Sequence, residues 1–174
     1  MTNPDLPDFG LEDGPGGIVS LYSDGVPTVA YALVDAHGHV LRAFDAERVF
    51  YSASTVKLGV LIAALREVQS GAWSLEDELR VTHEFASIVP EAGRFVMDAE
   101  ETDPGLGSPG DIVSRAWVLN RMTTVSANCA TNMWFEALGP EKIAAVSRDA
   151  GSPETRMGRP YSDEAGLAAG ITNS

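Results

Sequence analysis

The stretch YSASTVKLGVLIAALREV, residues 51–68, decides how this sequence folds. Its apolar side chains recur at the spacing of a helix face, and the residues that share this spacing are Leu58, Leu61, Ile62, Leu65 and Val68. Val60 and Ala64 extend the apolar surface almost all the way round. Because such helices are usually buried, we expect a central helix that begins at Ser54 and ends at Gly71.

Lys57 is one of only two lysines in the chain, and it follows Ser54 by three residues. Residues three apart on a helix share a face, with β-carbons about 5–6 Å apart. A serine hydroxyl is a poor nucleophile until a base takes its proton, and a lysine can be that base when burial lowers its pKa. For an isolated Ser-x-x-Lys, a capping serine beside a snorkelling lysine is nevertheless the more common explanation.

A second short motif, Ser126-Ala127-Asn128, is expected in a loop between two predicted helices. A serine at this place can relay a proton between Lys57 and a leaving group. An asparagine two residues later can bind a substrate amide and fix the lysine. Taken alone, the motif is also typical of an ordinary loop that caps a helix.

Two stretches resemble a known family: RVFYSASTVKLGVLIAALREVQSGAWSLEDEL (48–79) and SANCATNMWFEALGPEKIAAVSRDAGSPETRMGRP (126–160). They resemble the nucleophile helix and the second motif of the serine β-lactamase and penicillin-binding protein superfamily, nearest to class A. The signature set of that superfamily is Ser-x-x-Lys, Ser-Asp-Asn and Lys-Thr-Gly. The resemblance runs from about Ile18 to Arg159.

The resemblance implies a role for each motif residue. Ser54 would be the acylated nucleophile and Lys57 its general base. Ser126 would relay the proton, and Asn128 would orient the substrate amide. The backbone N–H of Ser54 would form half of an oxyanion hole. The partner would be a small-molecule acyl substrate, and no cofactor is implied.

Two differences from class A concern the second motif and the deacylating base. Ala127 stands where class A enzymes usually have aspartate. In an alignment on Arg159, Tyr161 takes the place of the deacylating glutamate. Asp163 or Glu164 could replace that glutamate if the loop shifted, although solvated loop acids are the simpler interpretation. Without the base an acyl-enzyme would persist, which suits a peptidase, esterase or acyltransferase better than an efficient lactamase.

The Lys-Thr-Gly motif does not occur before Ser174. We therefore expect a β-lactamase-like domain at 18–174 that is incomplete at its C-terminus, behind a mobile acidic tail at 1–17. The predicted fold class is α+β, a mostly helical portion with an N-terminal β-hairpin, at 28–36 and 39–44, of an incomplete antiparallel sheet. Open sheet edges invite association, so we expect self-association or pairing with a missing C-terminal segment.

After the hairpin only helices are expected. The predicted elements are a capping-box-like helix start at SLEDEL (74–79), a long polar loop at 91–111, and helices at 111–122, 128–138 and 140–150. The segment 18–25 fits a strand or a helix equally well.

Composition argues against several classes of protein. A net charge of −13 disfavours nucleic-acid and anionic-membrane partners. The chain has no apolar stretch long enough for a membrane span and no signal-peptide pattern at its start, so we expect a cytoplasmic location. The single cysteine, Cys129, excludes an internal disulfide and is expected as a buried small side chain. His37 and His39 lack further ligands nearby, so no metal site is expected.

Three functions remain open. The leading one is a β-lactamase-like serine hydrolase that acts through an acyl-Ser54 intermediate on a β-lactam, ester or peptide-like acyl donor. The second is a penicillin-binding-protein-like peptidase, esterase or acyltransferase. The third is a catalytically silent, truncated homologue or binding module. The four motif residues favour an enzyme, and the absent third motif favours the silent alternative for the 174-residue chain alone.

Overall fold

The chain divides into two compact units, with the boundary in the sequence after Arg48. The structure, a computed structural model, describes residues 29–174. The expected acidic tail at 1–17 and the undecided segment at 18–25 lie outside the described residues. The first unit therefore contributes a hairpin, and the second contributes everything from Val49 onward.

The hairpin consists of β1 (Tyr31–Val34) and the antiparallel strand β2 (Val40–Phe44), and it pairs Tyr31 with Phe44. Gly38 adopts φ +83° in the turn, a backbone conformation that glycine takes without steric cost. Among the described residues no third strand pairs with this hairpin. The predicted hairpin is confirmed, with shorter strands than expected.

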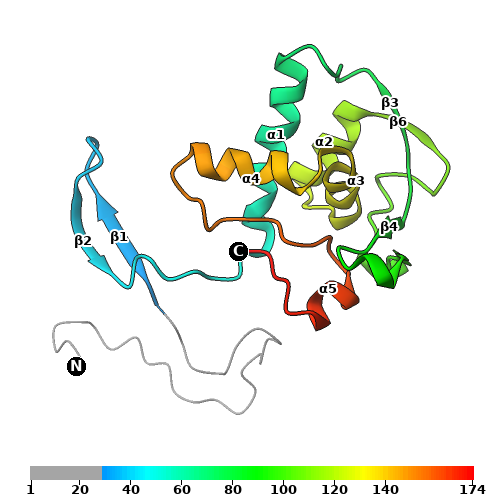
Figure 1. Ribbon diagram of the computed structural model, residues 1–174. Coiled ribbons are helices and arrows are strands. Elements are labelled where there is room, and N and C mark those ends of the chain that lie inside the picture. The colour runs from blue at the N-terminus through cyan, green and yellow to red at the C-terminus, as the bar shows by residue number, and fades with distance from the viewer. Residues whose placement is uncertain (1–28) are drawn as a thin grey trace, which may run out of the picture. The chain divides into compact units, whose positions relative to one another are not determined.

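The second unit is mainly helical, as predicted. Its helices are α1 (Lys57–Gln69), α2 (Arg115–Thr124), α3 (Asn128–Leu138), α4 (Pro140–Asp149) and α5 (Glu164–Ala168), and a 3₁₀ turn, η1 (Ala53–Val56), leads into α1. Helix α1 packs against α2, α3 and α4 (Figure 1). The predicted helices at 128–138 and 140–150 are thus confirmed to within one residue.

Short strands and turns lie between α1 and α2, so the expectation of only helices after the hairpin is wrong. The elements are β3 (Glu78–Arg80), β4 (Glu84–Ala86), η2 (Pro90–Ala92), β5 (Arg94–Val96), η3 (Ala99–Glu101) and β6 (Ile112–Ser114). Strand β3 pairs with β6, and β4 pairs with β5, both antiparallel. Three residues are too few for a visible alternation of apolar and polar side chains, which is the signal for a strand.

Two predicted helix starts are also wrong, for local reasons. The Ser74 hydroxyl accepts from the Glu76 N–H, and Asp77 Oδ2 accepts from the Ser74 N–H, so the capping residues close a turn that leads into β3. The helix expected from Asp111 begins later, because residues 112–114 pair in β6 and Ser114 caps α2 by accepting from the N–H of Trp117.

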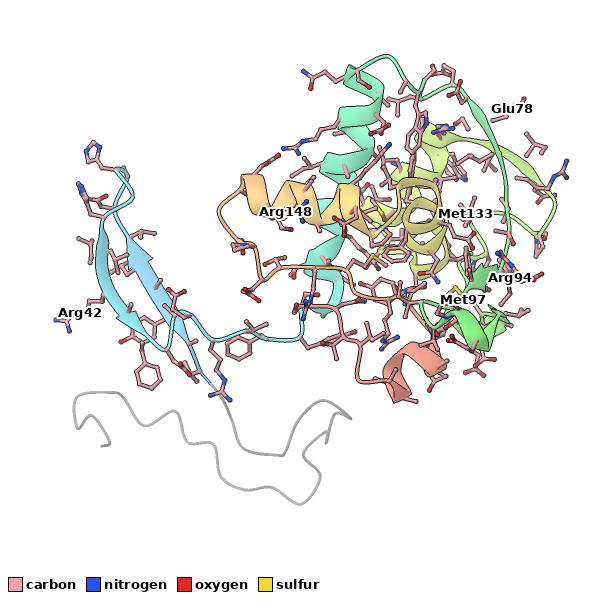
Figure 2. The ribbon with its side chains drawn as sticks, in the orientation of Figure 1. Arg42, Glu78, Arg94, Met97, Met133 and Arg148 are labelled. Carbon is pink, nitrogen blue, oxygen red and sulfur yellow. The ribbon has the colours of Figure 1, made fainter. Side chains whose placement is uncertain are left out.

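Helix α3 lies at the centre of the second unit. Its buried residues are Cys129, Ala130, Thr131, Asn132, Met133, Trp134, Phe135 and Leu138. Met97, which follows β5, is buried as well (Figure 2). Asn132 lies among these mainly apolar residues, and its side chain forms hydrogen bonds to the backbone of Tyr161 inside the core.

Helix α1 is buried on one side only. Val60, Ala63 and Ala64 have exposed fractions of 2% or less, whereas Leu58 and Leu65 are 61% and 42% exposed. The expected burial all round the helix is therefore wrong for the described residues. In residues 29–174, no helix combines the length and the apolar character that a membrane crossing requires.

Candidate active site

Ser54 lies in the η1 turn, immediately before α1, and its side chain is exposed. The preceding residue, Ala53, has φ +46°, a conformation that residues with a β-carbon seldom adopt. The turn is fixed from both sides, since the N–H of Ser52 donates to the carbonyl of Asn173 at 3.0 Å and the hydroxyl of Tyr161 donates to the carbonyl of Ala53 at 2.8 Å. Ser54 is thus presented on a constrained backbone at the mouth of α1.

Lys57 is the first residue of α1 and is 5% exposed. Its Nζ donates to the carbonyl of Ser126 at 2.5 Å, to the Oγ of Ser126 at 2.8 Å, and to Oδ1 of Asn128 at 2.7 Å. Ser126 has φ +60°, which turns both its carbonyl and its hydroxyl toward the lysine. Three acceptors match the three N–H donors of an ammonium group, so the contacts describe a protonated lysine.

Ser126 connects Lys57 with Ser54. Its hydroxyl donates to the Oγ of Ser54 at 2.9 Å while accepting from Lys57. Since the hydrogen bonds of Nζ all go to the 126–128 segment in the described part of the chain, Lys57 reaches Ser54 through Ser126. The structure therefore brings Ser54, Lys57, Ser126 and Asn128 together, and their chemical roles stay a prediction.

Burial lowers the pKa of Lys57 from its ordinary value to about 8. The ring of Tyr161 covers the ammonium, with Nζ 4.7 Å from the ring centroid. A pKa of about 8 leaves roughly a tenth of the lysine neutral at pH 7, whereas an ordinary lysine would be neutral in less than about one molecule in a thousand. A pKa of about 8 is therefore consistent with the predicted role of Lys57 as a base near neutral pH.

Tyr161 occupies the position where the sequence alignment expects a deacylating glutamate. The side chain of Asn132 holds the backbone of Tyr161 on both sides. Asn132 Oδ1 accepts from the N–H of Tyr161 at 2.8 Å, and Asn132 Nδ2 donates to the carbonyl of Tyr161 at 2.9 Å. Burial raises the pKa of Tyr161 above its usual range, against smaller lowering contributions from Ser54 and Arg159. Tyr161 is therefore a neutral phenol at physiological pH and cannot act as a base there.

Asp163 and Glu164, the other candidates for deacylation, lie in different environments. Asp163 is 1% exposed, and its carboxylate accepts from the hydroxyl of Ser87 and from the N–H groups of Ile88 and Gly166. Glu164 is exposed at the start of α5. Asp163 is thus a buried, fully hydrogen-bonded cap and not the solvated acid we expected, whereas Glu164 is exposed as expected.

Sequence reasoning missed Asn132 and the contact between Tyr161 and Ala53. The signal for Asn132 was present, since an asparagine inside the apolar run CATNMWF needs a hydrogen-bonding partner when it is buried. The contact between Tyr161 and Ala53 joins residues 108 positions apart and leaves no local signal.

A pocket of about 430 Å³ opens beside the serines. Its lining residues are Ser54, Thr55, Lys57, Leu58, Leu61, Met122, Thr123 and Ser126. In residues 29–174 no group of three or more His, Cys, Asp and Glu side chains is arranged to hold a metal ion. Cys129 is buried, and burial raises the pKa of its thiol to about 12, so it is not a nucleophile at neutral pH.

Comparisons with known proteins identify the family and the fold of this chain. The model of the beta-lactamase enzyme family matches residues 19–173. A beta-lactamase from Sphaerobacter thermophilus superposes with a TM-score of 0.58 at 20% identity, over 77% of this chain and 46% of that one, a likeness of fold. PBP-A superposes with a TM-score of 0.56 at 25% identity, over 76% of this chain and 45% of that one. An ancestral class A beta-lactamase superposes with a TM-score of 0.51 at 28% identity, over 77% of this chain and 46% of that one.

A mutant of PBP-A has been solved as an acyl-enzyme complex with penicillin G. A search of curated proteins finds no match. The chain spans about half the length of the solved structures that it matches.

Proposed function

Because this chain belongs to the beta-lactamase enzyme family, we propose that its protein forms an acyl-enzyme at Ser54 with β-lactam, ester or peptide-like acyl substrates. The observation that supports this most is the continuous hydrogen-bond path from Lys57 through Ser126 to the Ser54 hydroxyl. A path of this kind activates a serine without histidine or metal.

In the proposed reaction, neutral Lys57 takes the proton of the Ser126 hydroxyl while Ser126 takes the proton of Ser54. The Ser54 oxygen then forms a bond with the substrate carbonyl carbon, and the carbonyl electrons move onto its oxygen. The N–H of Ser54 stabilises that oxyanion. When the tetrahedral intermediate collapses, the bond to the leaving nitrogen or oxygen breaks. The leaving group receives a proton from Ser126, which Lys57 reprotonates.

Asn128 has two parts in this proposal. Its Oδ1 accepts from Lys57, which keeps the lysine turned toward Ser126. Its amide N–H groups would donate to the amide carbonyl of the acyl substrate. The apolar wall of the pocket, formed by Leu58, Leu61 and Met122, would exclude water from the reacting atoms.

The buried, neutral Tyr161 favours the second function over an efficient lactamase. A water molecule that attacks the acyl-Ser54 ester needs a base, and a tyrosine that keeps its proton cannot serve. We therefore infer a long-lived acyl-enzyme, as in a penicillin-binding-protein-like peptidase, esterase or acyltransferase. PBP-A, which is 25% identical to this chain, has been seen as an acyl-enzyme with penicillin G in a mutant that replaces a leucine with glutamate.

Intact-protein mass spectrometry after incubation with penicillin G or a fluorophosphonate tests the proposal. We expect one adduct per protein that persists for hours and disappears in Ser54→Ala. Ser52→Ala is the matched control, because the Ser52 hydroxyl lies in the same segment and has no hydrogen-bond partner among residues 29–174. A label retained in Ser54→Ala would refute the nucleophile, and rapid loss of the adduct would refute the inferred persistence. A protein that takes no label would favour the silent alternative.

A further inference from the structure

Tyr161 touches both the turn that carries the nucleophile and the lysine that activates it. Its hydroxyl donates to the carbonyl of Ala53 at 2.8 Å, and its ring centroid lies 4.7 Å from Nζ of Lys57. Tyr161 itself is 9% exposed, and its backbone is fixed at both ends by Asn132. A rigidly held side chain thus bridges two parts of the site.

We propose that Tyr161 is a positioning residue of the acylation step: its hydroxyl orients the turn that presents Ser54, and its ring shields the ammonium of Lys57 from water. The inference rests on the proposed acylation of Ser54. In this inference Tyr161 contributes to acylation itself, in addition to occupying the position where a deacylating carboxylate is absent.

The hydroxyl matters because the turn before Ser54 needs external support. Ala53 has φ +46°, and a residue with a β-carbon leaves that conformation readily unless neighbouring contacts hold it. The carbonyl that accepts from Tyr161 belongs to the peptide unit that ends at the N–H of Ser54. Because the Ala53 carbonyl and the Ser54 N–H belong to one planar peptide unit, holding the carbonyl also sets the direction of that N–H, the proposed oxyanion donor. It sets the position of the Ser54 backbone as well.

The ring matters because it covers the side of Lys57 that Ser126 and Asn128 leave open. Nζ of Lys57 donates its three hydrogen bonds to those two residues. In the described part of the chain no carboxylate forms an ion pair with this ammonium. The titratable groups that act on Tyr161 itself are Tyr51 and Arg159. The ring excludes water from the ammonium, which favours the neutral amine, while its π face attracts the cation; because burial lowers the pKa of Lys57, the loss of water outweighs that attraction.

The hydroxyl is tested by acylation kinetics of Tyr161→Phe in the intact protein with a fluorescent penicillin. We expect the limiting rate of acylation to fall roughly three- to tenfold, in keeping with the loss of one neutral hydrogen bond. The half-saturating penicillin concentration and the melting temperature should change little. Thr102→Val is the matched control, since it removes a similar hydroxyl-to-carbonyl bond, Thr102 to Ala99 at 2.7 Å, and neither residue lines the pocket beside the serines.

The ring is tested by NMR of protein labelled with ¹³C-lysine, to which residues 1–174 contribute the signals of Lys57 and Lys142, and the signal lost in Lys57→Arg is assigned to Lys57. In Tyr161→Ala water can reach the ammonium, so the pKa of Lys57 should rise from about 8 to about 9 or above. In Tyr161→Phe the ring remains, and the titration should stay near that of the wild type. Lys142 provides the reference signal. If Tyr161→Ala fails to fold, the kinetics of Tyr161→Phe still decide the hydroxyl's part.

These outcomes separate the two proposals. No Ser54-dependent label in the wild type would overturn the acyl-enzyme, whatever the lysine titration shows. Wild-type labelling with an unchanged limiting rate in Tyr161→Phe, or an unchanged Lys57 titration in a folded Tyr161→Ala, would overturn the positioning role and leave the acyl-enzyme standing.

Discussion

At the scale of single residues, the proposed reaction depends on the protonation of one lysine. Lys57 donates three hydrogen bonds when protonated, and it can act as a base only after losing one of its protons. The Ser126 hydroxyl is then the group placed to donate back to the amine. Because burial lowers the pKa of Lys57 to about 8, the change between these two arrangements falls within the range of ordinary buffers.

We expect the acylation rate of Ser54 to rise with pH and to level off above about pH 8. The sign follows from the base: its neutral form increases about tenfold per pH unit below the pKa and saturates above it. Rates measured with a fluorescent penicillin between pH 6 and 9.5 would show this profile. Lys57→Met should lose roughly 10²–10⁴ of the rate reached on the plateau above pH 8, and its remaining rate should not rise with pH in this range. A profile that is flat from pH 6 to 9.5 would contradict a lysine base.

At the scale of elements, α3 holds the loop that follows α4. Asn132 contributes both hydrogen bonds to the backbone of Tyr161, and it does so from a helix whose other inward residues are mainly apolar. Buried amide and carbonyl groups that lose their partners cost far more than the net value of a typical hydrogen bond. The loop position of Tyr161 is therefore set by one side chain of α3.

Asn132→Ala should lower the free energy of unfolding by about 2–4 kcal/mol, because it leaves the N–H and C=O of Tyr161 unpaired in the interior. Urea denaturation followed by circular dichroism measures this change. Asn120→Ala on α2 is the control, since Asn120 is exposed and its replacement should stay within about 0.5 kcal/mol. Equal losses in the two variants would mean that Asn132 does not anchor the loop.

The sequence was informative where one element repeats a pattern over many residues. The spacing of Leu58, Leu61 and Leu65 predicts α1, and the order of the Ser54 and Ser126 motifs predicts which residues meet. The hydrophobic pattern does not reveal strands of three residues that pair with a distant strand, as in β3 and β6. Capping residues such as Ser74 fit a turn and a helix start equally well. Partners fixed only by tertiary packing leave no local trace.

At the scale of the whole molecule, residues 29–174 carry much exposed apolar surface. Leu58, Ile62 and Leu65 are 61%, 36% and 42% exposed along α1, and the residues of β2 are exposed throughout. Soluble monomers seldom expose contiguous apolar surface of this kind. The hairpin also leaves strand edges unpaired among the described residues, and such edges favour association.

We expect the polypeptide of residues 1–174, prepared by itself, to self-associate and to hydrolyse nitrocefin negligibly. Size-exclusion chromatography with light scattering, run beside the nitrocefin assay, measures both properties. Ile62→Gln with Leu65→Gln should reduce association, whereas Val96→Gln, an equally polar change at a 70% exposed residue of β5, should not. A monodisperse monomer with Ser54-dependent turnover would show that these 174 residues suffice for catalysis.

The way in which Asn132 holds the loop has an evolutionary consequence. Its amide recognises the main chain of residue 161 and is indifferent to the side chain that residue carries. Under the proposed mechanism, a substitution at 161 would therefore alter how long the acyl group stays on the protein while the loop keeps its path. Descendants of one scaffold could diverge toward acyl release or acyl retention without first having to rebuild the fold around the nucleophile.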